Sequence, residues 1–173
     1  MRILLTSEFL LAYAIGFFCI YLPDGFYKNF LAENLVIFMR SIIPSVNGYW
    51  EKSIFPEVSA FYLSVQPLIF LPAFIRMIKE KDICFDNGGL DGVYLYIKKK
   101  RFPSLIAILG VVLFVLLAFV FYAQPGYQFG LMPVNEKRWA LGIFGPIVGF
   151  GSVYFSLALA WHYFSVFLRT LRD

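Results

Sequence analysis

The residue types that most often carry out chemistry in proteins are few in this chain and far apart. Its one histidine, His162, stands between Trp161 and Tyr163 in an apolar stretch. A haem ligand or a proton relay is one interpretation of such a residue, but a haem of the b type would need a second axial histidine. We favour a place in the aromatic belt at a membrane interface, where amphipathic rings gather.

Two carboxylates, Glu8 and Glu57, lie in or beside apolar segments. An ionisable group inside a membrane costs at least roughly 2.5 kcal/mol and therefore suggests a functional role. Each of these two lies within a turn or two of an expected helix end, where a carboxylate can reach water, so we interpret both as structural. Cys19 and Cys84 show no CxxC or metal-binding spacing. We therefore expect a protein that is not an enzyme and holds neither cofactor nor metal.

The composition is typical of a membrane protein. The chain has 173 residues, of which 60% are hydrophobic and 20% aromatic, and its mean hydropathy is +0.73. A water-soluble domain is rarely so apolar. The net charge of +4 would suggest nucleic-acid binding in a soluble protein. Here we attribute the basic residues to membrane topology, and we expect a lipid bilayer and no nucleic acid as the partner.

Four apolar segments are candidates for membrane crossings. Residues 103 to 124 contain no charged residue and no histidine. At about 1.5 Å of rise per helical residue, this segment reaches across a hydrocarbon core of roughly 30 Å. Residues 3 to 22, 54 to 78 and 139 to 168 are the other expected crossings. The sequence therefore predicts a single all-α membrane domain over residues 1 to 173, built as a bundle of four transmembrane helices.

The segments between the crossings are more polar. Residues 23 to 53 form an expected outer loop, in which the apolar run 34 to 43 is too short to cross and suits a helix lying in the interface. Residues 44 to 48, Pro-Ser-Val-Asn-Gly, are expected to break the chain. Residues 79 to 102 form an expected inner loop whose run 93 to 97 is β-like.

The distribution of basic residues sets the orientation. With the loop of residues 79 to 102 and both chain ends on one side, that side holds ten of the fifteen Lys and Arg residues: Arg2, Arg76, Lys79, Lys81, Lys98, Lys99, Lys100, Arg101, Arg169 and Arg172. Cytoplasmic loops carry an excess of Lys and Arg, so this side is predicted to be cytoplasmic. No internal repeat is evident in the sequence, which weakens an inverted-repeat transporter interpretation.

The second crossing is the least lipid-like. Ser59, Tyr62 and Gln66 recur on one helical face and form a polar stripe that should face protein. Pro67 and Pro72 predict a kink, because proline lacks the N–H of the helical hydrogen bond. In a membrane, the freed carbonyl groups need partners from neighbouring helices.

The fourth crossing carries small residues at spacings of three and four: Gly145, Gly149, Ser152, Ser156 and Ala160. Such a stripe lets another helix approach closely. On the first crossing, Ala12 and Gly16 share a face with Glu8 and form a similar stripe. These stripes predict helix–helix contact surfaces.

Two short motifs lie at the end of the outer loop and in the second crossing, Pro44-Ser45-Val46 and Tyr62-Leu63-Ser64-Val65-Gln66-Pro67. They resemble motifs of the immunity proteins of pore-forming colicins, particularly the A and B type. Members of that family carry Pro-Ser-Ile before the second helix and Tyr-x-Lys-Thr-Ala-Pro within it, at a similar separation. Tyr62 and Pro67 match the motif, whereas Ser64 and Val65 stand where the family has Lys and Thr.

The resemblance implies a multi-pass protein of the bacterial inner (cytoplasmic) membrane that protects its producer from a pore-forming toxin. Such a protein binds the membrane-inserted helices of the toxin and prevents the channel from opening. The residues that we expect to contact the toxin are the loop charges and the two stripes, since charges reject wrong partners and small residues admit helices: Lys28, Glu33, Arg40, Ser59, Tyr62, Ser64, Gln66, Pro67, Gly145, Gly149, Ser152 and Ser156.

Other functions stay open at this point. An immunity protein against a depolarising effector delivered by cell contact would have the same features. An accessory subunit of a membrane transport or respiratory complex would use the same stripes for a permanent partner. An enzyme acting on lipid or quinone would need Glu57, Gln66 and His162 at one depth, and their predicted positions argue against this.

Overall fold

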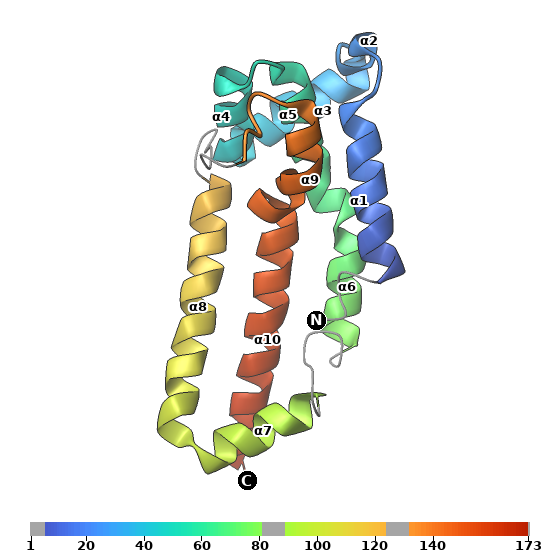
Figure 1. Cartoon of the computed structure of the whole chain (residues 1–173). Coiled ribbons are helices and arrows are strands. Elements are labelled where there is room, and N and C mark those ends of the chain that lie inside the picture. Colours follow the sequence, from blue (N-terminus) through green and yellow to red (C-terminus); the bar gives the residue numbers. More distant parts are fainter. Residues whose placement is uncertain (1–5, 81–88, 124–131, 173) are drawn as a thin grey trace.

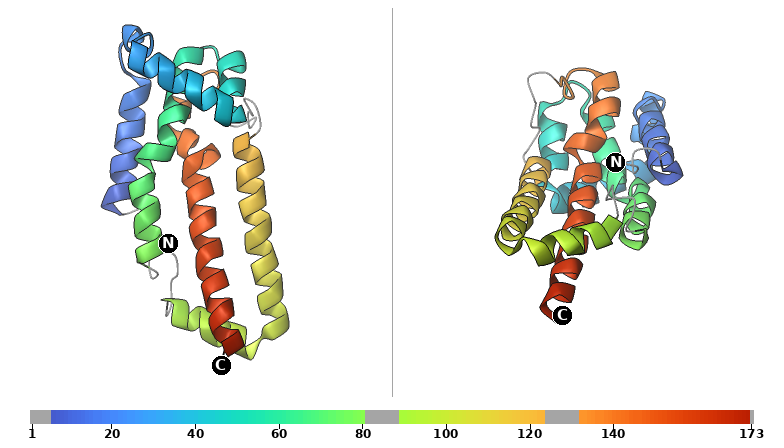
Figure 2. Two further views of the ribbon diagram at one scale, coloured as in Figure 1. Left: turned by 180° about the vertical axis from the view of Figure 1, so that it is seen from behind. Right: turned by 60° about the horizontal axis from the view of Figure 1, so that its bottom comes forward.

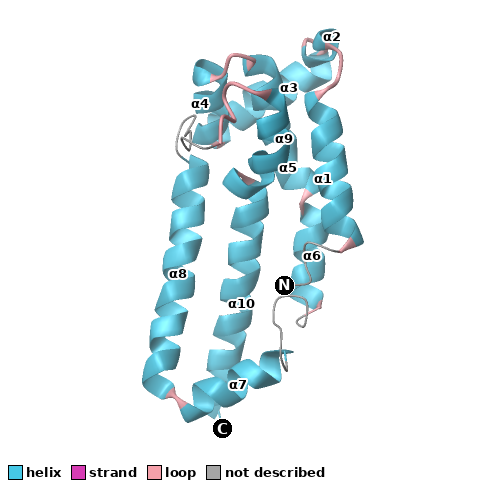
Figure 3. Ribbon diagram, in the orientation of Figure 1, coloured by secondary structure: helices cyan, strands magenta, loops and turns pink. Residues whose placement is uncertain are grey.

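The structure is a computed structural model that describes residues 6 to 80, 89 to 123 and 132 to 172. Every regular element in these ranges is a helix and none is a strand, as Figure 3 shows, which confirms the all-α prediction. The β-like interpretation of residues 93 to 97 is wrong, because they belong to helix α7 (Gly89–Lys99). Cys84 lies outside the described residues.

The long helices run side by side along one axis (Figure 1). They are α1 (Ser7–Ile20), α5 (Pro56–Ile69) followed by α6 (Leu71–Lys79), α8 (Arg101–Ala123), and α9 (Arg138–Val148) followed by α10 (Phe150–Arg172). These elements coincide with the four predicted crossings. Within the described ranges, the stretches Pro56–Lys79 and Arg138–Arg172 are long and apolar enough to cross a membrane, and α1 and α8 contain shorter apolar helices.

Short helices cover the two ends of these long helices. At one end are α2 (Asp24–Tyr27), α3 (Phe30–Ile42) and α4 (Pro44–Lys52), and α3 runs across the end of the molecule (Figure 2). At the other end, α7 packs across the C-terminal part of α10 and leads into α8 (Figures 1 and 2). The break predicted at residues 44 to 48 falls one residue earlier, at Ile43 between α3 and α4. Residues 44 to 48 are themselves helical, and Pro44 is the first residue of α4, a position where the missing N–H costs little.

Helix α5 lies at the centre of the core. It contacts α1, α3, α4 and α9, so its buried residues lie on all sides: Val58, Ser59, Ala60, Phe61, Tyr62, Leu63, Ser64 and Gln66. A helix that is buried on every side depends on its neighbours, because its polar side chains must find partners among them.

The two long stretches, Pro56–Lys79 and Arg138–Arg172, are each interrupted. The break between α5 and α6 falls at Phe70, between Pro67 and Pro72, and confirms the predicted kink. The hydroxyl of Tyr154 on α10 donates a hydrogen bond to the carbonyl of Pro67 at 3.0 Å. The carbonyl of Pro67 belongs to the last turn of α5, so a neighbouring helix supplies a partner for a carbonyl group beside the kink. The break between α9 and α10 falls at Gly149, which has non-helical backbone angles, so the expected single helix 139 to 168 is in fact two.

Candidate functional site

Gln66 connects the two broken helices. Its side chain is fully buried, and its Oε1 accepts a hydrogen bond from the backbone N–H of Phe150 at 2.9 Å. Phe150 is the first residue of α10, where backbone N–H groups have no partner within the helix. Gln66 therefore caps α10 at the break. Its Nε2 and the hydroxyl of Tyr62 are buried without a hydrogen-bond partner in the described structure.

The ring of Tyr62 lies in a slot between two glycines. A Cβ atom placed on Gly16 of α1 would lie 2.9 Å from Cε2 of the ring, and one placed on Gly145 of α9 would lie 2.5 Å from Cε1. Gly149 likewise faces the amide oxygen of Gln66. The glycines of both predicted stripes are therefore used to pack the helices of this chain against one another.

Most of the stripe residues proposed to contact a partner are buried inside the chain. Ser59 donates to the carbonyl of Phe55 at 3.1 Å, and Ser64 donates to that of Ala60 at 2.7 Å. Residues with this placement are Ser59, Tyr62, Ser64, Gln66, Gly145, Gly149 and Ser156. A partner could reach them only by displacing neighbouring helices. A direct partner contact for them stays a prediction, while their part in the chain's own packing is observed.

Ser152 is half-buried and lines an opening in the bundle. A cavity of about 140 Å³ lies between α1, α6, α9 and α10, and we call it the central cleft. Its lining is almost entirely apolar and comprises Phe9, Phe70, Ala73, Met77, Pro146, Ile147, Gly151, Ser152, Tyr154 and Phe155. Ile147, at the rim, is 53% exposed. The break between α9 and α10 thus places small residues beside an accessible apolar hollow.

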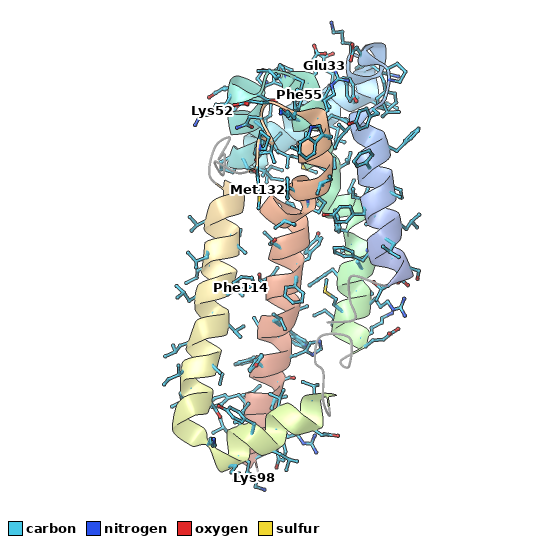
Figure 4. All side chains as sticks on the ribbon, in the orientation of Figure 1. Glu33, Lys52, Phe55, Lys98, Phe114 and Met132 are labelled. Atoms are coloured by element: carbon cyan, nitrogen blue, oxygen red, sulfur yellow. The ribbon has the colours of Figure 1, made fainter. Side chains whose placement is uncertain are left out.

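The predicted loop charges lie at the end formed by α2, α3 and α4. Lys28 lies 3.8 Å from Glu57, and Glu33 is exposed at the start of α3 (Figure 4). Arg40 has a structural role, because its Nη2 donates to Oδ1 of Asn47 at 2.8 Å and its guanidinium lies 4.7 Å from the centre of the Trp50 ring. Lys28 and Glu33 are therefore the more accessible of the three charges.

Two tyrosines, Tyr27 and Tyr49, are buried at this end. The hydroxyl of Tyr27 donates at 2.8 Å to the carbonyl of Cys19, in the last turn of α1. Burial raises the pKa of Tyr27 to about 12, and burial also raises the pKa of Tyr49. Both side chains stay protonated at physiological pH, so the Tyr27 hydroxyl remains a hydrogen-bond donor.

The structure corrects the interpretation of His162. The side chain is 1% exposed and lies between α10 and α6, where its Nε2 is 2.8 Å from the carbonyl oxygen of Met77. It is a core residue and not part of an outer aromatic belt. Glu8 forms an ion pair with Arg76, which agrees with the structural role expected for it.

The structure does not bring together Glu57, Gln66 and His162, the three residues that an enzyme acting on lipid or quinone would need at one depth. Glu57 is beside Lys28, Gln66 binds the start of α10, and His162 contacts α6, so each has a different neighbour. Across the described ranges, no group of three or more His, Cys, Asp and Glu side chains is placed to hold a metal ion.

Sequence reasoning missed the break at Gly149 and the cleft beside it. The available signal was the run Pro146, Gly149 and Gly151, because proline and closely spaced glycines interrupt helices. No pattern in the sequence indicated that Phe9 and Tyr154 line the cleft, since their positions depend on how distant helices pack. Comparisons of the chain with protein-family models, with curated proteins and with solved structures found no match.

Proposed function

We propose that this protein is an inner-membrane immunity protein that binds a membrane-inserted helix of a pore-forming bacteriocin and keeps its channel closed. In this proposal the chain crosses the membrane four times, through α1, α5–α6, α8 and α9–α10. Helices α2, α3 and α4 face the periplasm, and α7 and both chain ends face the cytoplasm.

The surface of α8 supports membrane insertion. Large apolar side chains are exposed along this helix: Leu105, Ile106, Leu109, Val112, Leu113, Phe114, Leu116, Leu117, Phe119 and Val120. A soluble protein rarely exposes so continuous an apolar surface. Phe114 lies between the two polar ends of the molecule, with Glu33 and Lys52 at one end and Lys98 at the other (Figure 4).

The central cleft is the observation that carries the binding proposal. It is lined by apolar side chains, and the half-buried Gly151 and Ser152 are small enough to let another helix approach closely. In lipid, helix association depends on such close packing, because the lipid chains are as apolar as the helices. An apolar toxin helix fits this chemistry, and the exposed Lys28 and Glu33 would discriminate among toxins at the periplasmic end.

The test is protection of sensitive bacteria. Cells that express the chain are exposed to a panel of pore-forming bacteriocins, and the membrane potential is followed with a voltage-sensitive dye. We expect one toxin to lose its effect. The variant Ile147→Trp should lose protection, because the larger side chain covers the cleft rim.

The matched control is Ile143→Trp, which changes an exposed residue one turn away on α9 that does not line the cleft. It should insert normally and protect. If the wild-type chain reduces depolarisation by none of the toxins, the immunity proposal is wrong. Recovery of a stoichiometric membrane complex from unstressed cells would instead support an accessory subunit.

A further inference from the structure

A second hollow lies at the opposite end of the molecule. It has a volume of about 470 Å³ and is formed by α7, α8 and α10. Its polar lining residues are Lys98, Ser104 and Thr170, and Ile97 and Phe167 contribute apolar walls. The hydroxyl of Ser104 donates to the carbonyl of Lys100, just before α8, and that of Thr170 donates to the carbonyl of Phe167 in α10. Lone pairs of both oxygens therefore remain available to accept hydrogen bonds.

This hollow lies in the most basic part of the chain. Residues 89 to 101 and 169 to 172 contain six basic residues and one acidic residue. The acid, Asp91, lies 3.7 Å from Arg169. Nζ of Lys98 donates to the hydroxyl of Tyr94 at 3.4 Å. Among the described residues of these two segments, basic residues therefore outnumber acidic ones by five.

The basic hollow continues into an apolar groove. The groove has a volume of about 410 Å³ and runs between α8 and α10. Ile108 and Phe167 line both spaces, which makes them adjoining parts of one site. Farther along, Val112, Ala160 and Phe164 line the groove. From the hollow to the groove, the lining between α8 and α10 changes from cationic and hydroxylated to largely apolar.

We propose that this composite site binds an anionic phospholipid of the cytoplasmic leaflet. The phosphate lies beside Lys98, head-group hydroxyls donate to Ser104 and Thr170, and one acyl chain occupies the groove between α8 and α10. The charge of the hollow selects an anionic head group, and basic pockets between membrane helices are suited to such lipids. A free phosphate ion would satisfy the hollow but leave the groove empty, so the lipid accounts for both parts.

The proposal shares with the proposed function only the placement of the chain in a membrane. The lipid site and the central cleft have no lining residue in common. Loss of the lipid should therefore leave the toxin-binding surface intact, which allows the two proposals to fail separately.

The test measures lipid retained by the purified full-length chain. Protein from the membrane fraction is incubated in detergent with equimolar phosphatidylglycerol and phosphatidylcholine, and bound lipid is counted by native mass spectrometry. We expect the wild type to prefer phosphatidylglycerol and Lys98→Gln to reduce that preference about fivefold. Lys79→Gln, an exposed lysine at the end of α6, removes the same charge outside the site and should have no effect.

Two further measurements separate the head group from the acyl chain. Ala160→Leu fills the groove and should reduce retention of both lipids, and millimolar inorganic phosphate should not displace phosphatidylglycerol. The proposal is overturned if the wild type shows no preference, if Lys79→Gln acts as strongly as Lys98→Gln, or if inorganic phosphate releases the lipid. Protection from toxin is measured on the same Lys98→Gln cells and should persist.

Discussion

The slot around Tyr62 makes Gly145→Ala the sharpest test of the packing. A Cβ atom at residue 145 would lie 2.5 Å from Cε1 and 3.2 Å from Cζ of the Tyr62 ring. An ordinary contact distance is at least 3.4 Å, so the ring or α9 would have to move by about 0.9 Å. The ring cannot move away from α9, because Gly16 of α1 closes the other side and the side chain is fully buried.

Overpacking of this kind typically costs about 1–3 kcal/mol. Replacing glycine by alanine within a helix normally stabilises the folded state by about 0.5–1 kcal/mol. The cost of the clash with Tyr62 must therefore exceed this gain. Gly110→Ala on α8 is the matched control, since a Cβ there meets nothing within 4 Å. We expect Gly145→Ala to lower the free energy of unfolding by about 1–2 kcal/mol and Gly110→Ala to leave it unchanged or raise it.

The assay is reversible unfolding of the purified chain in mixed micelles, followed by tryptophan fluorescence. Gly145→Ala is also measured in the Tyr62→Ala background, where the ring that it meets is absent. The cost of the glycine substitution should then largely disappear, which gives a coupling energy for the pair. Equal stability of the Gly145→Ala and Gly110→Ala proteins, or an unchanged cost in the Tyr62→Ala background, would refute the slot.

Two further predictions concern hydrogen bonds that join helices. Gln66→Leu removes the hydrogen bond that Oε1 of Gln66 accepts from the N–H of Phe150, so we expect a loss of about 1 kcal/mol in unfolding free energy. Toxin protection should weaken, with normal membrane insertion by fractionation. Unchanged stability would contradict the capping role. Tyr27→Phe removes the bond to Cys19 and should cost about 1 kcal/mol. Because the folded pKa of Tyr27 is about 12 against an ordinary 10.0, the stabilisation is complete below pH 10.0 and is lost as pH rises through about 12. Stability curves of wild type and Tyr27→Phe should therefore converge in that interval, and parallel curves would argue against it.

The long helices could be predicted because hydropathy directly reports the segments that avoid water. The crossing predicted at residues 54 to 78 corresponds to Pro56–Lys79, and its kink follows from the proline chemistry. The error at α7 has an equally local cause, since residues 93 to 97 alternate aromatic and β-branched or aliphatic side chains. Tertiary packing against α8 and α10 stabilises the helix in spite of that pattern.

The site residues were harder to predict, because a stripe of small or polar residues does not identify the helix that it contacts. Gly145 and Gln66 belong to real contact faces, but those faces meet α5 and α10 of the same chain. His162 illustrates the same ambiguity: its neighbours in sequence suggest an interface, while its partner, Met77, comes from a distant helix. The sequence pattern shows which residues can form helix contacts, but it does not show which helices contact one another.

The number and direction of the membrane crossings underlie every proposal made for this protein. The most direct measurement labels single cysteines with a membrane-impermeant maleimide in intact cells, in a chain whose Cys19 and Cys84 are replaced. Cysteine at position 33, in α3, should react, whereas cysteines at position 99, in α7, and position 172, at the end of α10, should react only after the membrane is opened. Reaction of positions 33 and 99 from the same side would contradict the four-crossing arrangement.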